Sequence, residues 1–410
     1  MRTNGVGTDA LVTPRGVATV AAWFAAGLGL GLIAAVLGLL GRLGGEPDAA
    51  AAPVAAVSQR GDCTQAPLSR RAAQVLVVGV PQVTTSLDPL ALEVLDIGVG
   101  GVFLNDGNVV DATQVQALTA GLHAASKVPL LVTTDEESGR VSTFRALIGA
   151  TSSPRTLASS SDPDAVRVYA RDLGMQLSEL GLNSDLAPVA DVDAGPWNGP
   201  IGDRSFSGDP AATAKYAEAF AIGLREGGLL PVAKHFPGHG RVVEDVHARS
   251  ARVDAPLEEL LATDLQPFIR LIEAGTPIVM VSHVRYDALG PGRPASLSPP
   301  TYRLLRDLRF HGVAMTDSIG MGAVHRQWDF PEAAVMAVKA GADAVLATDG
   351  TQAVAMRDAL VAAVHKGRLP KARLDDAVAR MLTAKGIDPG SMTCAKPPRA
   401  PAMAVAAAKP

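Results

Sequence analysis

Cysteine, aromatic residues and blocks of basic charge are all scarce in this chain of 410 residues. It has two cysteines, Cys63 and Cys394, and only 4% of its residues are aromatic. Neither cysteine lies in a Cys-x-x-Cys motif or a Cys/His cluster, which argues against a metal-binding role for either. The net charge is −4 and no basic run is present, so we expect no nucleic acid partner.

Charge is missing altogether between Arg15 and Arg42, where the chain reads GVATVAAWFAAGLGLGLIAAVLGLLG. About 20 apolar residues cross a bilayer, so this run predicts a transmembrane helix over residues 16–41. The flanking arginines place the N-terminus in the cytoplasm, which predicts a single-pass protein of the cell membrane with an extracytoplasmic domain. The alternative is a cleaved secretory signal, with its cleavage site in AAAAPVAAVS, that would leave a secreted protein.

The rest of the chain divides by composition. Residues 1–42 are the predicted cytoplasmic N-terminus and anchor, and residues 43–68, rich in Ala, Gly, Pro and Ser, are predicted to be a flexible linker. Residues 69–390 are predicted to fold as one domain. The Pro/Ala-rich segment 391–410 is predicted to be a disordered tail.

Eight apolar runs alternate with amphipathic stretches through the predicted domain. The runs are continuous rather than alternating, as strands buried on both faces require. They predict an α/β fold, a (β/α)8 TIM barrel, with a doubly wound open sheet as the second choice. The runs are 75–80, 97–104, 129–134, 182–192, 229–236, 277–284, 312–318 and 342–348.

The barrel prediction also bears on the two cysteines. The first strand of such a barrel neighbours its last helix, so the residues just outside each end of the domain lie near one another. We therefore predict a disulfide between Cys63 and Cys394 in an oxidising compartment. The alternative is two unrelated thiols on the flanks of the domain.

Polar residues gather directly after the apolar runs. The carboxyl ends of barrel strands are where such enzymes hold their chemistry, so these residues are candidates for a site. The alternative is that these residues are polar only because loops after strands are usually polar. This explains one or two of the six residues but not all of them. They are Asp135, Asp185, Lys234, His235, His283 and Asp317.

The stretch VAKHFPGHGRVVEDVHARS, residues 232–250, concentrates three histidines, a lysine and two acids. His235 and His239 are four residues apart, a spacing that binds metal when both lie on one face of a helix. Pro237 and Gly238 stand between them and are incompatible with a helix, so we do not predict a metal site.

Acid–base chemistry is the better interpretation of this stretch. A carboxylate at Asp245, two residues before His247, holds an imidazole and favours its protonated form, which can donate a proton near neutral pH. Asp317 ends a strand and supplies a carboxylate nucleophile for a two-step displacement. The alternatives are that the Asp-x-His triplet is a chance sequence on the protein surface without a function, and that Asp317 is a helix N-cap.

The motifs in this region resemble those of the β-N-acetylglucosaminidases of glycoside hydrolase family 3. The similarity runs from about residue 70 to residue 388. The motifs that carry it are LAPVADV, IGDRSFSGDP, AKHFPGHG followed by Asp-x-His, DLQPFIRLIEAG, VMVSHVRYDALG, PASLSP and HGVAMTDSIGM.

The resemblance implies a single-barrel retaining exo-enzyme that removes terminal β-linked N-acetylglucosamine through a covalent glycosyl-enzyme, without a cofactor. It implies that Asp317 is the nucleophile, His247 the acid/base and Asp245 its partner. We expect peptidoglycan-type fragments, carbohydrates containing N-acetylglucosamine, as substrates. Sugar-binding positions are matched by Asp135, Arg204, Lys234 and His235. Without the resemblance, Lys234 and His235 are as well explained as partners of loop carbonyls, and Arg204 as a partner of Asp203 or Asp209.

The chain departs from the family pattern where it reads DEESGR, residues 135–140, instead of Asp-Gln-Glu-Gly-Gly-Arg. Ser138 replaces a glycine of a tight loop, and Thr143 stands where many members have another arginine. Two alternatives to hydrolysis stay open, of which the second rests on these changes. One is a β-N-acetylglucosaminide phosphorylase, because a histidine acid/base does not repel phosphate as a carboxylate does. The other is a non-catalytic sugar-binding protein of the cell wall.

Overall fold

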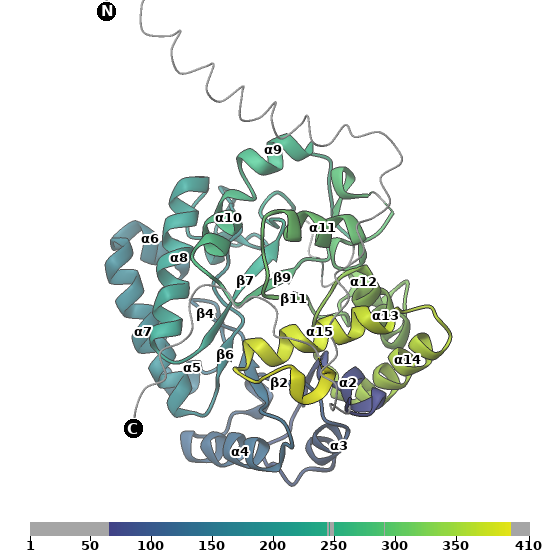
Figure 1. Cartoon of the computed structure of the whole chain (residues 1–410). Helices are drawn as coiled ribbons and strands as arrows, with labels where there is room; N and C mark the ends of the chain where they lie inside the picture. The colour runs from purple at the N-terminus through teal and green to yellow at the C-terminus, as the bar shows by residue number, and fades with distance from the viewer. Residues whose placement is uncertain (1–64, 244–245, 247–249, 291, 395–410) are drawn as a thin grey trace, which may run out of the picture. The chain divides into compact units, whose positions relative to one another are not determined.

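A computed structural model of the chain describes residues 65–243, 246, 250–290 and 292–394. Strands and helices alternate along this part of the chain, and two four-stranded parallel sheets hold most of the strands (Figure 1). One sheet has the order β12-β1-β2-β3 and the other β11-β9-β7-β6. Their bounds are β1 Leu76–Gly79, β2 Gly101–Leu104, β3 Leu131–Thr134, β6 Ser184–Asp185, β7 Leu230–Phe236, β9 Ile278–Val281, β11 Val313–Thr316 and β12 Val345–Ala347.

Each of the eight apolar runs contains one of these parallel strands, so the prediction of a mixed α/β fold with parallel strands is confirmed. The short strands outside the two sheets were not predicted. They are β4 Glu136–Ser138 paired antiparallel with β5 Val141–Ser142, and β8 Arg252–Val253 paired with β10 Arg285–Tyr286.

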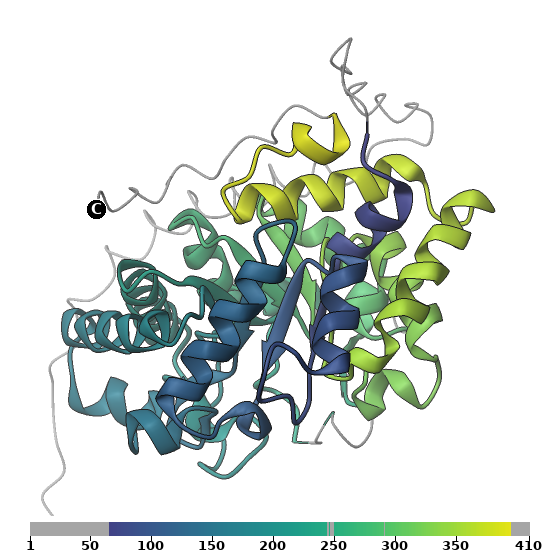
Figure 2. The same cartoon turned by 90° about the horizontal axis from the view of Figure 1, so that it is seen from below.

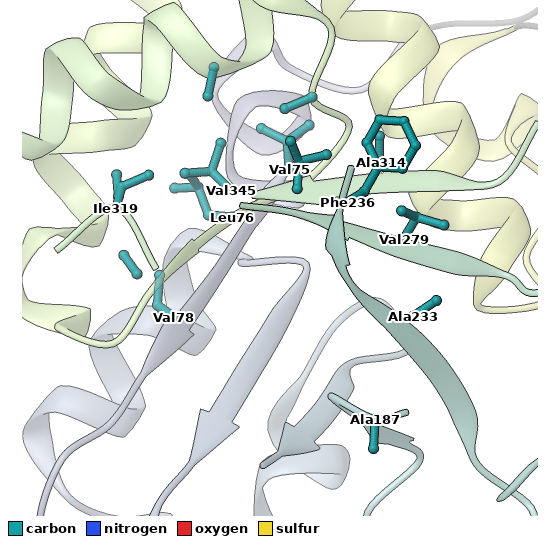
Figure 3. Close-up of a cluster of buried hydrophobic side chains, with 14 of the residues drawn as sticks. Val75, Leu76, Val78, Ala187, Ala233, Phe236, Val279, Ala314, Ile319 and Val345 are labelled. Atoms are coloured by element: carbon teal, nitrogen blue, oxygen red, sulfur yellow. The ribbon is translucent and has the colours of Figure 1, made fainter. Parts of the chain in front are cut away.

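Both faces of the parallel strands are covered by apolar side chains, which explains why the runs do not alternate with polar residues. In β9, Val279 and Val281 pack in one cluster, while Ile278 and Met280 pack in another on the opposite face. The larger cluster fills the space between strands and helices, and Figure 3 shows part of it. The residues labelled there are Val75, Leu76, Val78, Ala187, Ala233, Phe236, Val279, Ala314, Ile319 and Val345.

Backbone hydrogen bonds also connect the outer strands of the two sheets. Leu186 donates its N–H to the carbonyl of Thr134 at 2.8 Å, which links the end of β6 to β3. Thr316 donates to the carbonyl of Ala344 at 3.0 Å, which links β11 to the residue before β12.

The helices lie between successive strands, and aspartates begin several of them. Asp162 and Asp209 accept backbone N–H bonds at the starts of α7 and α8, and each is followed by a proline at the first helical position. The helices are α2 Leu68–Gln74, α3 Pro89–Ile97, α4 Ala112–Ala125, α5 Arg145–Ile148, α6 Pro154–Ser160, α7 Pro163–Glu179, α8 Pro210–Glu226, α9 Leu257–Ala262, α10 Gln266–Glu273, α11 Pro299–Asp307, α12 Gly322–His325, α13 Phe330–Ala340, α14 Ala353–His365, α15 Lys371–Ala384 and α16 Gly390–Thr393.

The pattern PLEELLATDLQPFIRLIEAG predicts one helix ending at Gly275, but the structure has two, α9 and α10. The break falls at Thr263 and Asp264, just before Pro267, which cannot donate an N–H in a helix interior. The break turns Asp264 toward Arg241, whose Nε donates to the Asp264 carboxylate at 2.8 Å.

The two ends of the described chain lie side by side. Helix α2 packs against α14 and α15, and Figure 2 shows α15, in yellow, next to α2, in purple. The Ala66 N–H donates to the Met392 carbonyl at 3.0 Å, and the Gln65 amide donates to the Thr393 carbonyl at 2.9 Å. Helix α16 falls in the predicted disordered tail, so the folded domain continues to Cys394. Cys63 lies outside the described residues, and the disulfide stays a prediction.

The predicted single-pass membrane localisation requires correction. In the described part of the chain, no helix is both long enough and apolar enough to cross a bilayer. Even α7 and α8, with 17 residues each, are shorter than the roughly 20 residues that a span takes, and both carry charged residues. The segment 16–41, on which the prediction rested, lies outside the described residues.

Candidate active site

A cavity of about 710 Å3 opens at the carboxyl ends of the parallel strands. Asp135 follows β3, Lys234 and His235 lie near the end of β7, and Asp317 follows β11, so residues from three strands far apart in sequence line one space. The polar side chains of its lining are Asp135, Glu137, Arg140, Asn198, Arg204, Lys234, His235, His239, Asp317, Ser318 and Thr348.

Lys234 is the buried cation of the site, with only 2% of its side chain exposed. Its Nζ lies 2.5 Å from Asp135 Oδ1 and 2.5 Å from Glu137 Oε1. Burial alone would lower the pKa of Lys234, but the two carboxylates outweigh it and raise that pKa above its usual value. Lys234 is therefore a permanent charge, and it does not merely satisfy loop carbonyls.

Arg204 forms a two-pronged ion pair with Glu137, at 2.6 Å from Nε and 2.7 Å from Nη2. Burial would raise the pKa of Glu137, but Arg204 and Lys234 hold it well below its usual range. The alternative partners for Arg204 were wrong, because Asp203 pairs with Arg140 at 2.8 Å and Asp209 caps α8. Glu137 received no role from the sequence, although it lies in the DEESGR motif.

His235 is held by Asp191, a residue to which the sequence gave no role. The His235 Nδ1 lies 2.7 Å from Asp191 Oδ2, and the backbone N–H groups of His235 and His239 donate to Asp191 Oδ1 at 3.1 and 2.7 Å. Burial would raise the pKa of Asp191, but the His235 ring and these donors lower it. Asp191 ends the LAPVADV motif, and its place inside a conspicuous motif was the signal that could have identified it.

Asp317 presents its carboxylate to the cavity from the end of β11. Its N–H donates to the Val281 carbonyl at 2.9 Å, and its Oδ1 accepts the Ser318 N–H at 2.7 Å. Burial would raise the pKa of Asp317, but the nearby His283 and His235, the Ser318 N–H and Lys234 lower it. The Asp317 carboxyl is thus held ionised, as a nucleophile requires.

His283 lies behind Asp317 and is completely buried. Its Nε2 lies 2.8 Å from the Ser318 carbonyl and its Nδ1 lies 2.7 Å from Ser296 Oγ. The first of these contacts fixes the turn that carries the Asp317 carboxylate. The sequence grouped His283 with the polar residues after strands, but assigned it no function.

His239 lines the cavity beside His235, and their ring centroids lie 5.6 Å apart. Burial and the His235 charge lower the pKa of His239 to about 4, so this imidazole is neutral at neutral pH. Within residues 65–243, 246, 250–290 and 292–394, no group of three or more His, Cys, Asp and Glu side chains could hold a metal ion.

The predicted acid/base His247 and its partner Asp245 lie outside the described residues. Val246, which stands between them, is described and buried, and its side chain lines the same cavity. The Val246 carbonyl accepts the Ala323 N–H from α12 at 3.2 Å.

Hydrogen bonds of Ser138 and Thr143 hold the loop that contains the DEESGR motif. Ser138 has φ 74°, a left-handed conformation that suits the glycine of the family pattern, and its Oγ lies 2.9 Å from the Tyr169 hydroxyl. Thr143 donates its hydroxyl to the Asp135 carbonyl at 3.0 Å. Both replacements thus hold the loop from which Asp135 and Glu137 enter the cavity.

The chain is similar to known proteins over most of its described residues. Residues 68–384 match the Glycosyl hydrolase family 3 N terminal domain. The Beta-hexosaminidase LpqI of Mycobacterium tuberculosis is 40% identical over 327 residues, which cover 78% of this chain and 82% of that protein. The solved structure of M tuberculosis LpqI has a TM-score of 0.73 and 38% identity, over 80% of this chain and 98% of that one.

A second structural neighbour is the Beta-N-acetylhexosaminidase from Beutenbergia cavernae, with a TM-score of 0.72 and 32% identity over 78% of this chain and 99% of that one. The family match and the relatives cover nearly all of the described domain, which confirms the resemblance found in the motifs. The chain belongs to glycosyl hydrolase family 3 and is a glycoside hydrolase.

Proposed function

We propose that the protein is a retaining exo-β-N-acetylglucosaminidase that hydrolyses terminal β-linked N-acetylglucosamine through a covalent glycosyl-enzyme. The observation that carries the proposal is Asp317, an ionised carboxylate at the cavity, beside positive groups that lower its pKa. Asp317 attacks the anomeric carbon, and His247, oriented by Asp245, first protonates the leaving oxygen and then activates water. Relatives named Beta-hexosaminidase and Beta-N-acetylhexosaminidase support the choice of sugar.

Four polar side chains are proposed to bind the sugar in the cavity of about 710 Å3. Asp135 comes from the loop after β3, Arg204 comes from the 3-10 helix η2 (Gly202–Arg204), and Lys234 and His235 come from the end of β7. Their charges are already paired within the protein, so they offer oriented donors and acceptors to neutral hydroxyl groups. Such preorganisation fixes the anomeric carbon over the nucleophile.

We further propose that the eight parallel strands close into a (β/α)8 barrel. The hydrogen bonds from Leu186 to Thr134 and from Thr316 to Ala344 support closure, because they join the two sheets at both of their edges. The second apolar cluster, which includes Val77, Met280 and Met315, is then the barrel interior.

Peptidoglycan-type fragments are the glycans that we propose as natural substrates. The support is the similarity of the motifs to a family of N-acetylglucosaminidases and a cavity of about 710 Å3, which lies in the usual size range of small-ligand sites.

Burst kinetics with an aryl β-N-acetylglucosaminide test the proposal. We expect a burst of the phenol, and NMR of the first sugar product should show the β-anomer. Formation of a sugar phosphate when phosphate is added would instead identify a phosphorylase. Binding of N-acetylglucosamine without any turnover would identify a sugar-binding protein and would refute the proposed reaction.

A further inference from the structure

A separate pocket of about 440 Å3 lies along helix α13, and we call it the α13 pocket. Glu332, Val335, Met336 and Lys339 form one of its walls, with the spacing that places four residues on one face of a helix. The rest of the lining comes from residues 292–293, the first residue of α11, the residue Trp328 before α13, and the segment between α14 and α15. Among the residues that the structure describes, none lines both this pocket and the cavity of about 710 Å3.

Part of the lining of the α13 pocket is apolar. Val335 and Ala340 are buried, and Pro299, Met336 and Trp328 are half-buried. The Trp328 indole N–H has no hydrogen-bond acceptor within the described part of the chain. An indole in this state offers a flat apolar face and one free donor to a ligand.

The charged side chains of the α13 pocket are mostly cationic. Arg293, Lys339 and Arg368 line it and are exposed. Arg368 donates to Glu332, the one carboxylate of the lining, at 3.2 Å. The Arg293 and Lys339 side chains have no hydrogen bond or ion pair with any residue that the structure describes. The lining therefore holds two uncompensated positive charges, and its free side-chain groups are donors.

These features select the chemistry of a ligand. Free donors need acceptor oxygens, and two uncompensated cations match two negative charges better than the single charge of a carboxylate. A phosphate monoester has a charge of about −2 at neutral pH and three strong acceptor oxygens. Arginine and lysine both bind phosphate, the arginine through its planar fork and the lysine as a point charge. The apolar part of the lining requires an apolar group on the ester side of the phosphate.

We propose that the α13 pocket binds a soluble phosphate monoester of an aromatic or aliphatic alcohol. The Arg293 and Lys339 side chains hold the phosphate, and the apolar group packs against Trp328 and Val335. The pocket volume lies in the usual size range of small-ligand sites. This site goes beyond the proposed hydrolysis, because none of its residues belongs to the candidate active site.

Isothermal titration calorimetry of the full-length protein with 1-naphthyl phosphate tests the proposal. Inorganic phosphate supplies the charge without the apolar group, 1-naphthol supplies the apolar group without the charge, and 1-naphthoate carries one charge instead of two. We expect 1-naphthyl phosphate to bind roughly tenfold or more tightly than each of the three. Excess N-acetylglucosamine should leave its Kd unchanged, and competition between the two would place the phosphate in the candidate active site and overturn the proposal.

Two variants test the pocket itself. Lys339→Glu should weaken the binding of 1-naphthyl phosphate roughly tenfold or more, because it replaces a free cation by an anion. Trp328→Ala should weaken it roughly three- to tenfold and leave the binding of inorganic phosphate unchanged. Lys339 is exposed, so Lys339→Glu tests the charge even if Trp328→Ala, at a half-buried residue, unfolds the protein.

Lys215→Glu is the matched control, because Lys215 is an exposed lysine of α8 outside the pocket lining. Its Kd for 1-naphthyl phosphate should stay within about twofold of the wild-type value, since exposed charges more than about 10 Å away are largely screened at 0.1 M salt. Equal losses in Lys215→Glu and Lys339→Glu, or an unchanged Kd in Lys339→Glu, would overturn the proposal. The same holds if 1-naphthoate binds as tightly as 1-naphthyl phosphate, or if the wild type does not bind 1-naphthyl phosphate.

Discussion

The carboxylate of Asp191 holds the His235 ring at 2.7 Å while it also accepts the backbone N–H groups of His235 and His239. One buried side chain thus sets both the direction of an imidazole and the path of the loop that follows β7. That loop continues toward the predicted Asp245 and His247. The direction of the His235 ring and the start of the loop after β7 therefore depend on the same residue.

Asp191→Asn should lower kcat/KM for an aryl β-N-acetylglucosaminide roughly 10- to 100-fold, the usual effect of losing a hydrogen bond to a charged group. The amide keeps the shape of the side chain but cannot accept all three donors. Steady-state kinetics and thermal unfolding are measured together. Asp343→Asn is the control, because Asp343 is equally buried but pairs with Arg306 and Arg373 away from the cavity. Equal kinetic losses in the two variants would contradict a positioning role for Asp191.

Glu137→Ala should destabilise the fold by about 3–5 kcal/mol, because it leaves the buried Arg204 without its carboxylate partner and Lys234 with only one. Denaturant unfolding measures the loss. Glu218→Ala, which removes a more exposed pair with Arg270, should cost about 1 kcal/mol or less. A similar, small loss for both variants would show that the Glu137 pairs do not support the site.

Asp185→Asn should change how stability depends on pH. Asp185 is buried, its Oδ1 accepts the Glu136 N–H at 2.9 Å, and burial raises its pKa well above the usual value. A raised pKa in the folded state gives stability that is complete below the unfolded pKa of about 3.9 and is lost as pH rises through the folded pKa. From about pH 4 upward, the free energy of unfolding of the wild type should therefore fall relative to that of the variant.

Urea unfolding at several pH values provides this comparison, and carboxyl groups common to both proteins cancel in the difference. A difference that does not vary with pH would mean that Asp185 titrates normally in the folded protein.

His247→Ala should slow substrates with poor leaving groups far more than substrates with good ones. An activated phenol leaves with little protonation, whereas general acid catalysis contributes about 10²- to 10⁴-fold where protonation is needed. The measurement is kcat/KM for a series of aryl β-N-acetylglucosaminides, plotted against the pKa of the phenol. We expect a steeper slope for the variant than for the wild type. Equal slopes for the two proteins would show that His247 is not the general acid.

The strands were predictable because burial on both faces leaves an unmistakable apolar run. The run 182–192 shows the limit of this reasoning, since only Ser184–Asp185 is a strand. The rest is an irregular segment that places Asp191 beneath His235. Hydrophobicity cannot distinguish a buried strand from a buried irregular segment.

The candidate site was predicted mainly where a polar residue ends a strand, as at Lys234 and Asp317. The partners that hold these residues were missed, because Glu137 and Asp191 act through contacts across 97 and 44 residues of sequence, respectively, for Lys234 and His235. Such pairings are set by how the loops meet in space, which no local pattern records. The break between α9 and α10 was missed for the same reason, because Asp264 turns toward Arg241.

Trapping of the glycosyl-enzyme tests the central claim most directly. A 5-fluoro-N-acetylglucosaminyl fluoride should form the covalent intermediate and slow its hydrolysis, so that intact-mass spectrometry shows one added sugar. Peptide mapping should place that sugar on the Asp317 carboxylate, and Asp317→Ala should show no adduct and no turnover. An adduct on another residue, or near-full activity of Asp317→Ala, would contradict the account.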